Sequence, residues 1–469
     1  MRRFIKRAIA LLPILILMAG SAIAAAQEPE LIPIRATFEA MGAEVEWGVE
    51  DRRITIVLAD NIFVLFADSQ RAYVNNEAIT LHNNVFIDVD RSFMHLADFE
   101  YMTMPQAFFS EEVIIGEGGR WPLGGTLTMP VEASAENPVP VVLLVHGSGP
   151  LDRNLTIGVN HAFHDIAAYL SSNGIAVFRY DKRTLVHGAE LEEEYGTSFT
   201  VWEETIEDAI FAADFLRLDP RIDSDRIYMA GISLGGMLAP RIHASGGDFA
   251  GLIMLAGSPR QLFELGVDQS LHMIEVQRVM LQSQVALLEM MLETEDFEML
   301  GEFDPAARDL DDTMAMEHLL ALLWEADAIM ALLDAEEEAI EEFLEIVATL
   351  ADKTQEEAKV AMAGAWPAYY LRDMIMHPTP GFLAEITVPM LIMHGDNDFQ
   401  VFTEADFMLF MELLGDRDNV TFHLYPGLNH IFMPSVATHL NEAVMEMMMV
   451  PAQVHPQVLR DIVNWVLAR

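Results

Sequence analysis

Ser233 lies in the stretch Gly-Ile-Ser-Leu-Gly, residues 231–235, which has the pattern G-x-S-x-G. A short apolar strand pattern (226–230) precedes it, and helix-like apolar spacing (234–244) follows it. In a strand, turn and helix of this kind, the serine hydroxyl stands clear at the apex of a sharp bend, as an activated nucleophile requires. A motif this short also fits an ordinary tight bend. The rest of the chain must therefore supply partners for Ser233.

A nucleophilic serine needs a base within hydrogen-bond reach and a carboxylate that orients the base. Asp396 and Asp398 follow an apolar strand pattern, and His430 follows the next one. We prefer Asp398 to Asp396, because the G-x-x-D spacing from Gly395 places it beyond the turn after the strand. The chain order serine, aspartate, histidine predicts a catalytic triad of Ser233, Asp398 and His430.

Acyl transfer also needs backbone N–H groups directed at the oxyanion that develops during the reaction. The stretch "VHGSGPLDRN" (residues 145–154) follows the first strong central strand pattern. Gly147 and Gly149 permit close approach of this loop to the bend at Ser233. We therefore predict an oxyanion hole formed by the N–H groups of Ser148 and Leu234.

Buried-strand patterns alternate with helical ones in the elements that must position these residues. Short apolar strands separated by helices predict a mainly parallel sheet covered on both faces, which is an α/β fold. The strand patterns are residues 141–147, 175–181, 226–231, 251–257, 389–395 and 420–427. A β-hairpin is expected before them, in residues 111–130.

One interval, residues 261–388, interrupts this alternation. It is rich in Met, Leu and Glu and has helical patterns but no strand pattern, and its residues 264–373 contain 27 acidic and 5 basic side chains. Its many apolar residues argue against a disordered acidic segment. We predict that this helical insertion is a lid over Ser233, because it follows a strand at the carboxyl edge of the sheet.

Composition and charge restrict the classes of function further. The chain has no cysteine, which excludes disulfides, thiolate metal sites and a cysteine nucleophile. Its formal net charge of -46 opposes binding to nucleic acids and anionic membranes. Only four lysines occur. Such a surface suits concentrated salt, where repulsion is screened, and equally suits an acidic secreted protein.

The amino terminus has the features of an export signal. Four basic residues precede an apolar run (8–19), and small residues follow it. We expect residues 1–26 to be a signal peptide and the protein to be secreted or associated with the cell envelope. No later stretch has the length of a membrane span, so the mature chain is expected to be soluble.

Residues 31–81 read as a helix (37–41) followed by alternating strands. The stretch "PIRATFEAMGAEVEW" (33–47) and a weaker one, "RSFMHLADFEYM" (91–102), resemble the N-terminal stalk domain of copper amine oxidases. The resemblance implies a small α+β domain at residues 28–103, without copper or oxidase chemistry. The second domain then comprises residues 104–469.

The motifs "HGSGPLDRN", "FRYDKRT", "AGISLGGMLAPRI", "LAGSPR", "HGDNDFQV" and "LNHIF" resemble, in this order, those of bacterial α/β-hydrolase carboxylesterases. The resemblance spans residues 113–469 without the helical insertion. It implies the α/β-hydrolase fold and places Ser233, Asp398 and His430 at the triad positions.

We expect an exported serine hydrolase that cleaves carboxylic esters through an acyl-enzyme, with no metal or organic cofactor. The partners would be a small ester substrate and, through the N-terminal domain, a cell-envelope polymer. Two alternatives stay open. One is a serine peptidase or acyl transferase on the same fold, because a triad does not reveal the leaving group. The other is a cell-surface binding protein whose hydrolase fold is inert.

Overall fold

The structure is a computed structural model, which divides into two compact units, residues 1–102 and 103–469. The expected signal peptide and the expected domain boundary at Met104 both lie outside the described residues. The residues described are 31–49, 52–58, 61–74, 77–88, 91–95, 99, 108–295, 297–308 and 310–469.

The N-terminal unit contains an antiparallel sheet with strand order β1-β7-β6-β5-β4-β3-β2 and the helix α2 (Ile34–Ala40). The helix begins three residues before the expected Thr37, because Ile34 and Phe38, one turn apart, are both fully buried. In the strands every second side chain faces the core, as the alternating patterns predict. The strands are β1 (Leu31–Pro33), β2 (Glu44–Gly48), β3 (Arg53–Leu58), β4 (Asn61–Phe66), β5 (Ser69–Val74), β6 (Glu77–Asp88) and β7 (Arg91–His95).

The second unit contains an eight-stranded sheet with the order β19-β18-β15-β14-β10-β13-β9-β8. Strand β9 pairs antiparallel with β8 and β13, and the other pairs are parallel. This mainly parallel sheet confirms the predicted α/β-hydrolase fold class. The strands are β8 (Phe108–Ile115), β9 (Leu123–Pro130), β10 (Val139–Val145), β13 (Ala176–Tyr180), β14 (Ile222–Ile232), β15 (Gly251–Leu255), β18 (Met390–Gly395) and β19 (Val420–Tyr425).

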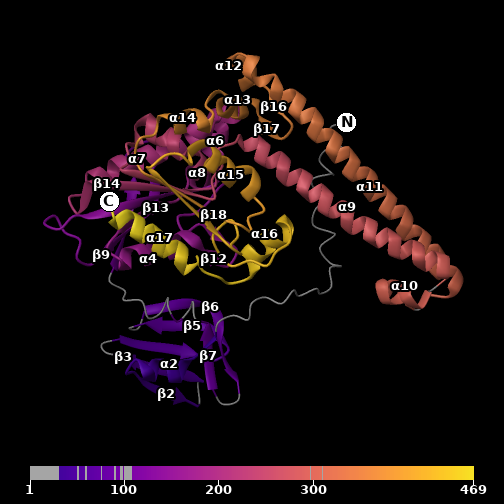
Figure 1. The fold of residues 1–469 in the computed structure, drawn as a ribbon, viewed down its shortest axis with the longest axis horizontal. Coiled ribbons are helices and arrows are strands. Elements are labelled where there is room, and N and C mark those ends of the chain that lie inside the picture. Colours follow the sequence, from indigo (N-terminus) through magenta and orange to yellow (C-terminus); the bar gives the residue numbers. More distant parts are fainter. Residues whose placement is uncertain are drawn as a thin grey trace. The chain divides into compact units, whose positions relative to one another are not determined.

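Helices cover both faces of this sheet (Figure 1), so its central strands are apolar on both sides. On β10, Leu143 and Val145 belong to one core cluster, whereas Val142 and Leu144 belong to the other. The first cluster packs against α7, α8 and α15, and the second against α4 and α17. These helices are α4 (Ala162–Ser172), α7 (Glu207–Arg217), α8 (Leu234–Ile242), α15 (Met408–Leu414) and α17 (Pro456–Leu467).

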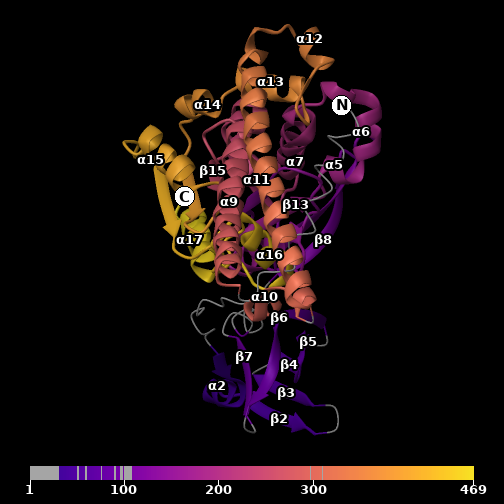
Figure 2. The ribbon, with the colours of Figure 1, turned by 90° about the vertical axis from the view of Figure 1, so that its right-hand side faces the viewer.

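Two long helices dominate the helical insertion, α9 (Leu262–Thr294) and α11 (Asp312–Ala348), which run side by side (Figures 1 and 2). On each helix, three of the buried residues recur at intervals of seven positions, as in a coiled-coil seam. These residues are Ile274, Leu281 and Leu288 on α9, and Leu319, Ala326 and Leu333 on α11. The shorter elements of the insertion are α10 (Phe297–Phe303), α12 (Gln355–Lys359), α13 (Ala368–Met376) and α14 (Thr379–Glu385).

The expectation that the insertion contains no strand is wrong. Two short strands, β16 (Met362–Ala363) and β17 (Trp366–Pro367), form a small antiparallel hairpin. Gly364 makes the turn at φ 57°, a left-handed conformation that glycine adopts without steric cost. Strands of two residues are too short to produce the alternating pattern by which strands are recognised in a sequence.

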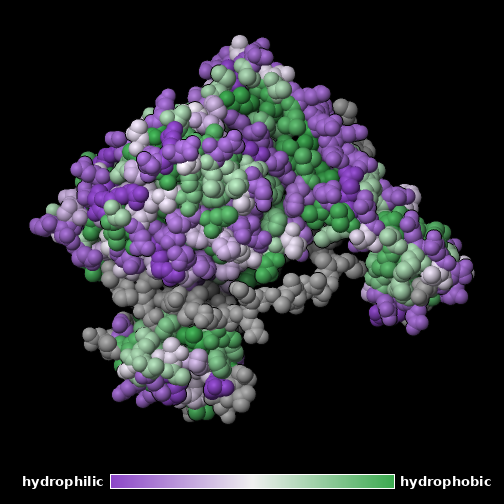
Figure 3. Space-filling view, viewed as in Figure 1, coloured by the Kyte–Doolittle hydropathy of each residue, from purple (hydrophilic) through white to green (hydrophobic). Residues whose placement is uncertain are grey.

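The paired helices carry a strongly acidic surface with exposed apolar side chains among the charges. Arg278 of α9 bridges to Asp334 and Glu337 of α11 at 2.9 and 2.6 Å. Hydrophobic side chains form a band along the pair in Figure 3, and Trp324 is 75% exposed. No helix in the described part of the chain combines the length and apolar composition needed to cross a bilayer.

Repulsion among these carboxylates should destabilise the protein in dilute buffer. We predict that the midpoint of thermal unfolding rises between dilute buffer and about 1 M NaCl, because the Debye length falls from about 10 Å at 0.1 M to about 3 Å at 1 M. Circular dichroism along a salt series measures this.

A matched variant identifies the charges responsible. Glu336→Gln/Glu338→Gln/Glu342→Gln neutralises exposed carboxylates of α11 and keeps the Arg278 bridges. It should melt at a higher temperature than wild type in dilute buffer and respond less to salt. Melting temperatures that stay flat or fall with salt would contradict the prediction.

Candidate active site

Ser233 lies in the bend between β14 and α8, with φ 55° and ψ -119°. A non-glycine residue in such a conformation is strained by about 1 to 3 kcal/mol and persists only where its surroundings fix it. The Ser233 N–H donates to the carbonyl of Leu255 at 2.8 Å, and its own carbonyl accepts from Met237 N–H at 2.9 Å. The strained backbone is thus anchored to a neighbouring strand and to the following helix.

Glycines allow the backbone segments around this bend to approach each other closely. A Cβ atom on Gly235 would lie 2.5 Å from the carbonyl oxygens of Val145 and His146, at the end of β10. A Cβ atom on Gly231 would lie 2.2 Å from the carbonyl oxygen of Gly235. Both separations are too short for real atoms, so the glycines of the motif are steric requirements of this bend.

The predicted oxyanion loop lies directly against Ser233. A Cβ atom on Gly147 would be 3.1 Å from Ser233 Cβ and 3.6 Å from its Oγ. Ser148 is exposed, and the Leu234 N–H lies in the first turn of α8, where N–H groups have no acceptor within the helix. The convergence of these two N–H groups on one oxyanion stays a prediction.

His146, the first residue of this loop, is buried, and its imidazole ring is uncharged at neutral pH. Burial and the nearby charge of Lys182 lower the pKa of His146 to about 3. The neutral ring therefore donates its Nε2–H to the carbonyl of Asp152 at 3.0 Å. This hydrogen bond joins the two ends of the loop.

Asp398 and His430 meet in the loops after β18 and β19. His430 Nδ1 lies 2.7 Å from Asp398 Oδ2, while Asp398 Oδ1 accepts from the N–H groups of Gln400 and Val401 at 2.8 and 3.0 Å. Burial alone would raise the pKa of Asp398, but His430 and the other donors together hold that pKa below its ordinary value. An ionised Asp398 fixes the tautomer with hydrogen on Nδ1, which leaves Nε2 of His430 free to accept a proton.

Asp396, the less favoured carboxylate, has a different role in the structure. Its Oδ1 accepts from Gly427 N–H at 2.6 Å and so joins the turns that follow β18 and β19. The structure therefore pairs His430 with Asp398 and not with Asp396.

Ser233 and His430 lie at the same edge of the sheet, because β14, β18 and β19 run in parallel and end there. Both residues are among those described, and no hydrogen bond joins them. Catalytic hydrogen bonds are often long before substrate binds. The complete triad thus stays a prediction, with its His430 and Asp398 half in hydrogen-bonding geometry.

Sequence reasoning missed several buried residues near the site. His394 lies 3.9 Å from Asp398 and donates to the Val401 carbonyl, and burial lowers its pKa. Glu204 contacts both Tyr370 and Lys182, and Lys182 in turn bonds to the Gly147 carbonyl of the oxyanion loop. No local pattern distinguishes these residues in the sequence.

Charged residues of the stretch "RYDKRT" (179–184) form ion pairs. Asp181 pairs with Arg153, Lys182 with Glu204 and, in the next turn, Arg183 with Asp208. Within the described ranges, no group of three or more His, Asp or Glu side chains is arranged to hold a metal ion.

The helical insertion contacts the region of the site from α9. His272 stacks on the ring of Phe399 at 5.7 Å between centroids and meets Phe402 edge-on. Gln269 Nε2 donates to the carbonyl of Gln400 at 2.5 Å. The insertion therefore packs against the Asp398 loop, while its covering of Ser233 stays a prediction.

Comparisons with known proteins agree with both resemblances seen in the sequence. Residues 20–104 match the model of the copper amine oxidase N-terminal domain. "Esterase EstD" of Thermotoga maritima is 32% identical over 329 residues, which are 70% of this chain and 61% of the relative. The chain thus spans less than two thirds of that relative's length.

The chain is also similar to solved structures, at sequence identities well below that of the esterase EstD. Est1E from Butyrivibrio proteoclasticus is 16% identical, with 76% of this chain and 99% of that chain covered and a TM-score of 0.39. Dipeptidyl peptidase 4 of Porphyromonas gingivalis is 14% identical, and the match covers 92% of this chain and 48% of that chain with a TM-score of 0.41. The model of the alpha/beta hydrolase family matches residues 142–440, well over half of the sequence, and the chain therefore belongs to the alpha/beta hydrolase family.

Proposed function

We propose that the protein hydrolyses carboxylic esters with Ser233, His430 and Asp398. The observation that carries this proposal is the strained Ser233 bend against the oxyanion loop, with a hydrogen-bonded histidine and aspartate at the same sheet edge. The relative named as an esterase supports esters as the substrate class.

In the proposed reaction, Ser233 Oγ attacks the ester carbonyl carbon while His430 Nε2 accepts its proton. The N–H groups of Ser148 and Leu234 stabilise the oxyanion of the tetrahedral intermediate. The intermediate collapses, the alcohol leaves with the proton from His430, and Ser233 carries the acyl group. A water molecule, deprotonated by His430, then attacks the acyl carbonyl carbon, the bond from that carbon to Ser233 Oγ breaks, and His430 returns its proton to Oγ as the acid leaves. Asp398 stabilises the imidazolium in both steps.

We further propose that this reaction takes place outside the cytoplasmic membrane, on the strength of the basic and apolar pattern in residues 1–26.

Ser233→Ala should lower esterase turnover by roughly three to six orders of magnitude while the fold is retained, because the covalent step is lost. Hydrolysis of p-nitrophenyl esters of increasing chain length, beside aminoacyl-anilides, measures this and separates esterase from peptidase activity. The exposed Ser283 on α9 gives a control, Ser283→Ala. A Ser233→Ala enzyme with more than a tenth of wild-type turnover would refute the assignment, and faster cleavage of anilides than of esters would favour the peptidase alternative.

Asp398→Asn should reduce kcat far more than Asp396→Asn, because only Asp398 bonds to His430 and fixes its tautomer. The two substitutions are chemically identical and two residues apart, so each controls for the other. Steady-state kinetics on one soluble ester decides between them. Equal losses, or a larger loss from Asp396→Asn, would show that the carboxylate is misassigned.

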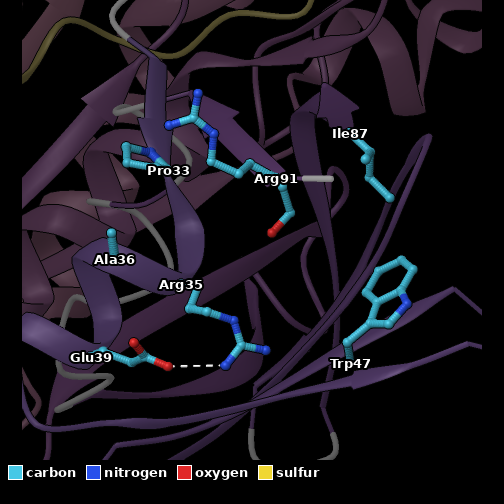
Figure 4. A pocket seen from close by; sticks show the side chains of 8 residues that line it. Pro33, Arg35, Ala36, Glu39, Trp47, Ile87 and Arg91 are labelled. Carbon is cyan, nitrogen blue, oxygen red and sulfur yellow. Dashed lines mark hydrogen bonds and ion pairs between the residues drawn. The ribbon is translucent and has the colours of Figure 1, made fainter. Parts of the chain in front are cut away.

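We also propose that the N-terminal unit binds a cell-envelope polymer. This unit has a pocket of about 470 Å³ lined by residues of α2 and of the four strands β1, β2, β6 and β7, including Arg35, Trp47 and Arg91 (Figure 4). Trp47 is 39% exposed, and Arg35 pairs with Glu39 at 2.9 Å. An exposed indole offers a flat apolar surface, and arginine recognises carboxylate or phosphate. Together they suit a saccharide polymer that carries acidic groups.

Trp47→Ala/Arg91→Ala should weaken retention of the protein on isolated bacterial cell wall by at least several-fold, and deletion of residues 28–103 should abolish it. Turnover on small soluble esters should stay nearly unchanged, because the triad residues all lie in the second unit. Val49→Ala is a matched control, since Val49 is 77% exposed on the same chain segment and does not line the pocket. Equal retention of wild type, pocket variant and deletion would reject the binding role.

A further inference from the structure

A buried ion pair contacts the oxyanion loop, residues 146–152. Lys182 Nζ donates to the carbonyl of Gly147 and to Glu204 Oε1, each at 2.6 Å. The two side chains are only 2% and 7% exposed. Removing two charges from water is costly, so their position beside the loop requires a reason beyond chance packing.

The contact with Gly147 determines the direction of the next N–H group. In a trans peptide the C=O and N–H bonds point to opposite sides. The carbonyl of Gly147 faces Lys182, so the N–H of Ser148 is directed away from Lys182. Gly147 is at the same time so close to Ser233 that a Cβ atom on it would lie 3.1 Å from Ser233 Cβ. Lys182 thus orients the peptide group that holds the predicted oxyanion donor.

A second set of contacts holds the loop beyond Ser148. The N–H of Gly149 donates to Glu204 Oε1 at 3.4 Å, and Thr184 Oγ1 donates to the Gly149 carbonyl at 3.2 Å. Gly149 has φ 89°, which a residue with a side chain rarely adopts. The backbone is therefore held on both sides of Ser148.

Glu204 is itself fixed by the helical insertion. Its Oε2 accepts from Tyr370 Oη of α13 at 2.6 Å. Burial and the charge of Glu204 raise the pKa of Tyr370 well above its ordinary value, so the hydroxyl keeps the proton that it donates. Glu204 lies in η3 (Trp202–Ile206), a single π-helical turn before α7, and such turns are frequent at functional sites.

We propose that Lys182 is a positioning residue for the oxyanion hole, and that Glu204 and Tyr370 hold its ammonium group in place. This inference rests on the proposed serine-hydrolase function and adds a determinant of kcat to it. It also gives the helical insertion a role in catalysis. Gly147 contacts Lys182, which contacts Glu204, and Glu204 contacts Tyr370 in α13 of the insertion.

The neighbouring pair Arg183 and Asp208 shows what a purely structural ion pair looks like here. Its side chains are 1% and 3% exposed, like those of Lys182 and Glu204. In the described structure, the side-chain hydrogen bonds and ion pairs of Arg183 go to Asp208 and Glu207, and none reaches the oxyanion loop. This pair is a matched control for burial and charge.

The test is Lys182→Met, which keeps the apolar stem and removes the donor. We expect kcat to fall roughly 10- to 100-fold with KM changed less than about threefold, because the oxyanion exists only in the transition state and intermediate. Affinity for an alkyl boronic acid, whose tetrahedral adduct on Ser233 imitates that intermediate, should fall by a similar factor. Tyr370→Phe should give a smaller loss of the same kind.

A single charge left in the core can prevent folding, so the double variant Lys182→Met/Glu204→Gln is included as a neutral replacement. The control is Arg183→Met/Asp208→Asn, and thermal melts by circular dichroism report folding for each protein. The expected result is a folded Lys182 and Glu204 double variant with low kcat and weak boronate binding, beside a control of nearly wild-type kcat.

Two results would overturn the inference: a folded Lys182 double variant with wild-type kcat, or a control pair that loses kcat and boronate affinity to the same degree. Failure of the proposed function is a separate result. It would show as wild-type protein without ester hydrolysis, or with hydrolysis that survives Ser233→Ala.

Discussion

The conformation of one residue, Ser233, constrains much of the second unit. Its backbone is strained, so the surrounding elements must hold it, and they do so from three directions. Strand β15 accepts its N–H through Leu255, α8 donates to its carbonyl through Met237, and the oxyanion loop packs against its side chain at Gly147. A sheet buried on both faces provides the rigidity that such an arrangement needs, because a solvent-exposed loop could relax the strain.

The helical insertion is attached to this framework at separated points. Gln269 of α9 bonds to the Asp398 loop, Tyr370 of α13 bonds to Glu204, and Thr379 of α14 bonds to the Met237 carbonyl of α8. Each contact lies within a few residues of a predicted catalytic or supporting group. The near part of the insertion is thus continuous with the core of the hydrolase unit, while its far end has a small core of its own around Leu288 and Leu319.

The features that could be predicted from the sequence are those that depend on residues close together in the chain. Buried parallel strands are continuous apolar runs, so the strands that carry the site could be predicted from runs such as 141–147 and 389–395. The elbow glycines and the order of Ser233, Asp398 and His430 were also visible. In contrast, no local pattern separates Glu204 from Glu203, which shares its π-helical turn, or from Glu207, which begins α7, and its partner Tyr370 is 166 residues away. Pairings of that kind depend on tertiary packing, and a single sequence has no pattern that reveals them.

The seven-residue repeat along α9 and α11 has a consequence for how this protein can vary in length. Buried residues recur at intervals of seven on both helices, from Ile274 to Leu288 and from Leu319 to Leu333. Loss or gain of seven residues in each helix would keep the seam in register and change the length of the pair by about 10 Å. A change that does not match the repeat would rotate polar side chains into the seam. Homologues whose helical insertions differ in length should therefore differ by whole heptads, with the same change in both helices. The attachment points at Gln269 and Tyr370 should stay the same.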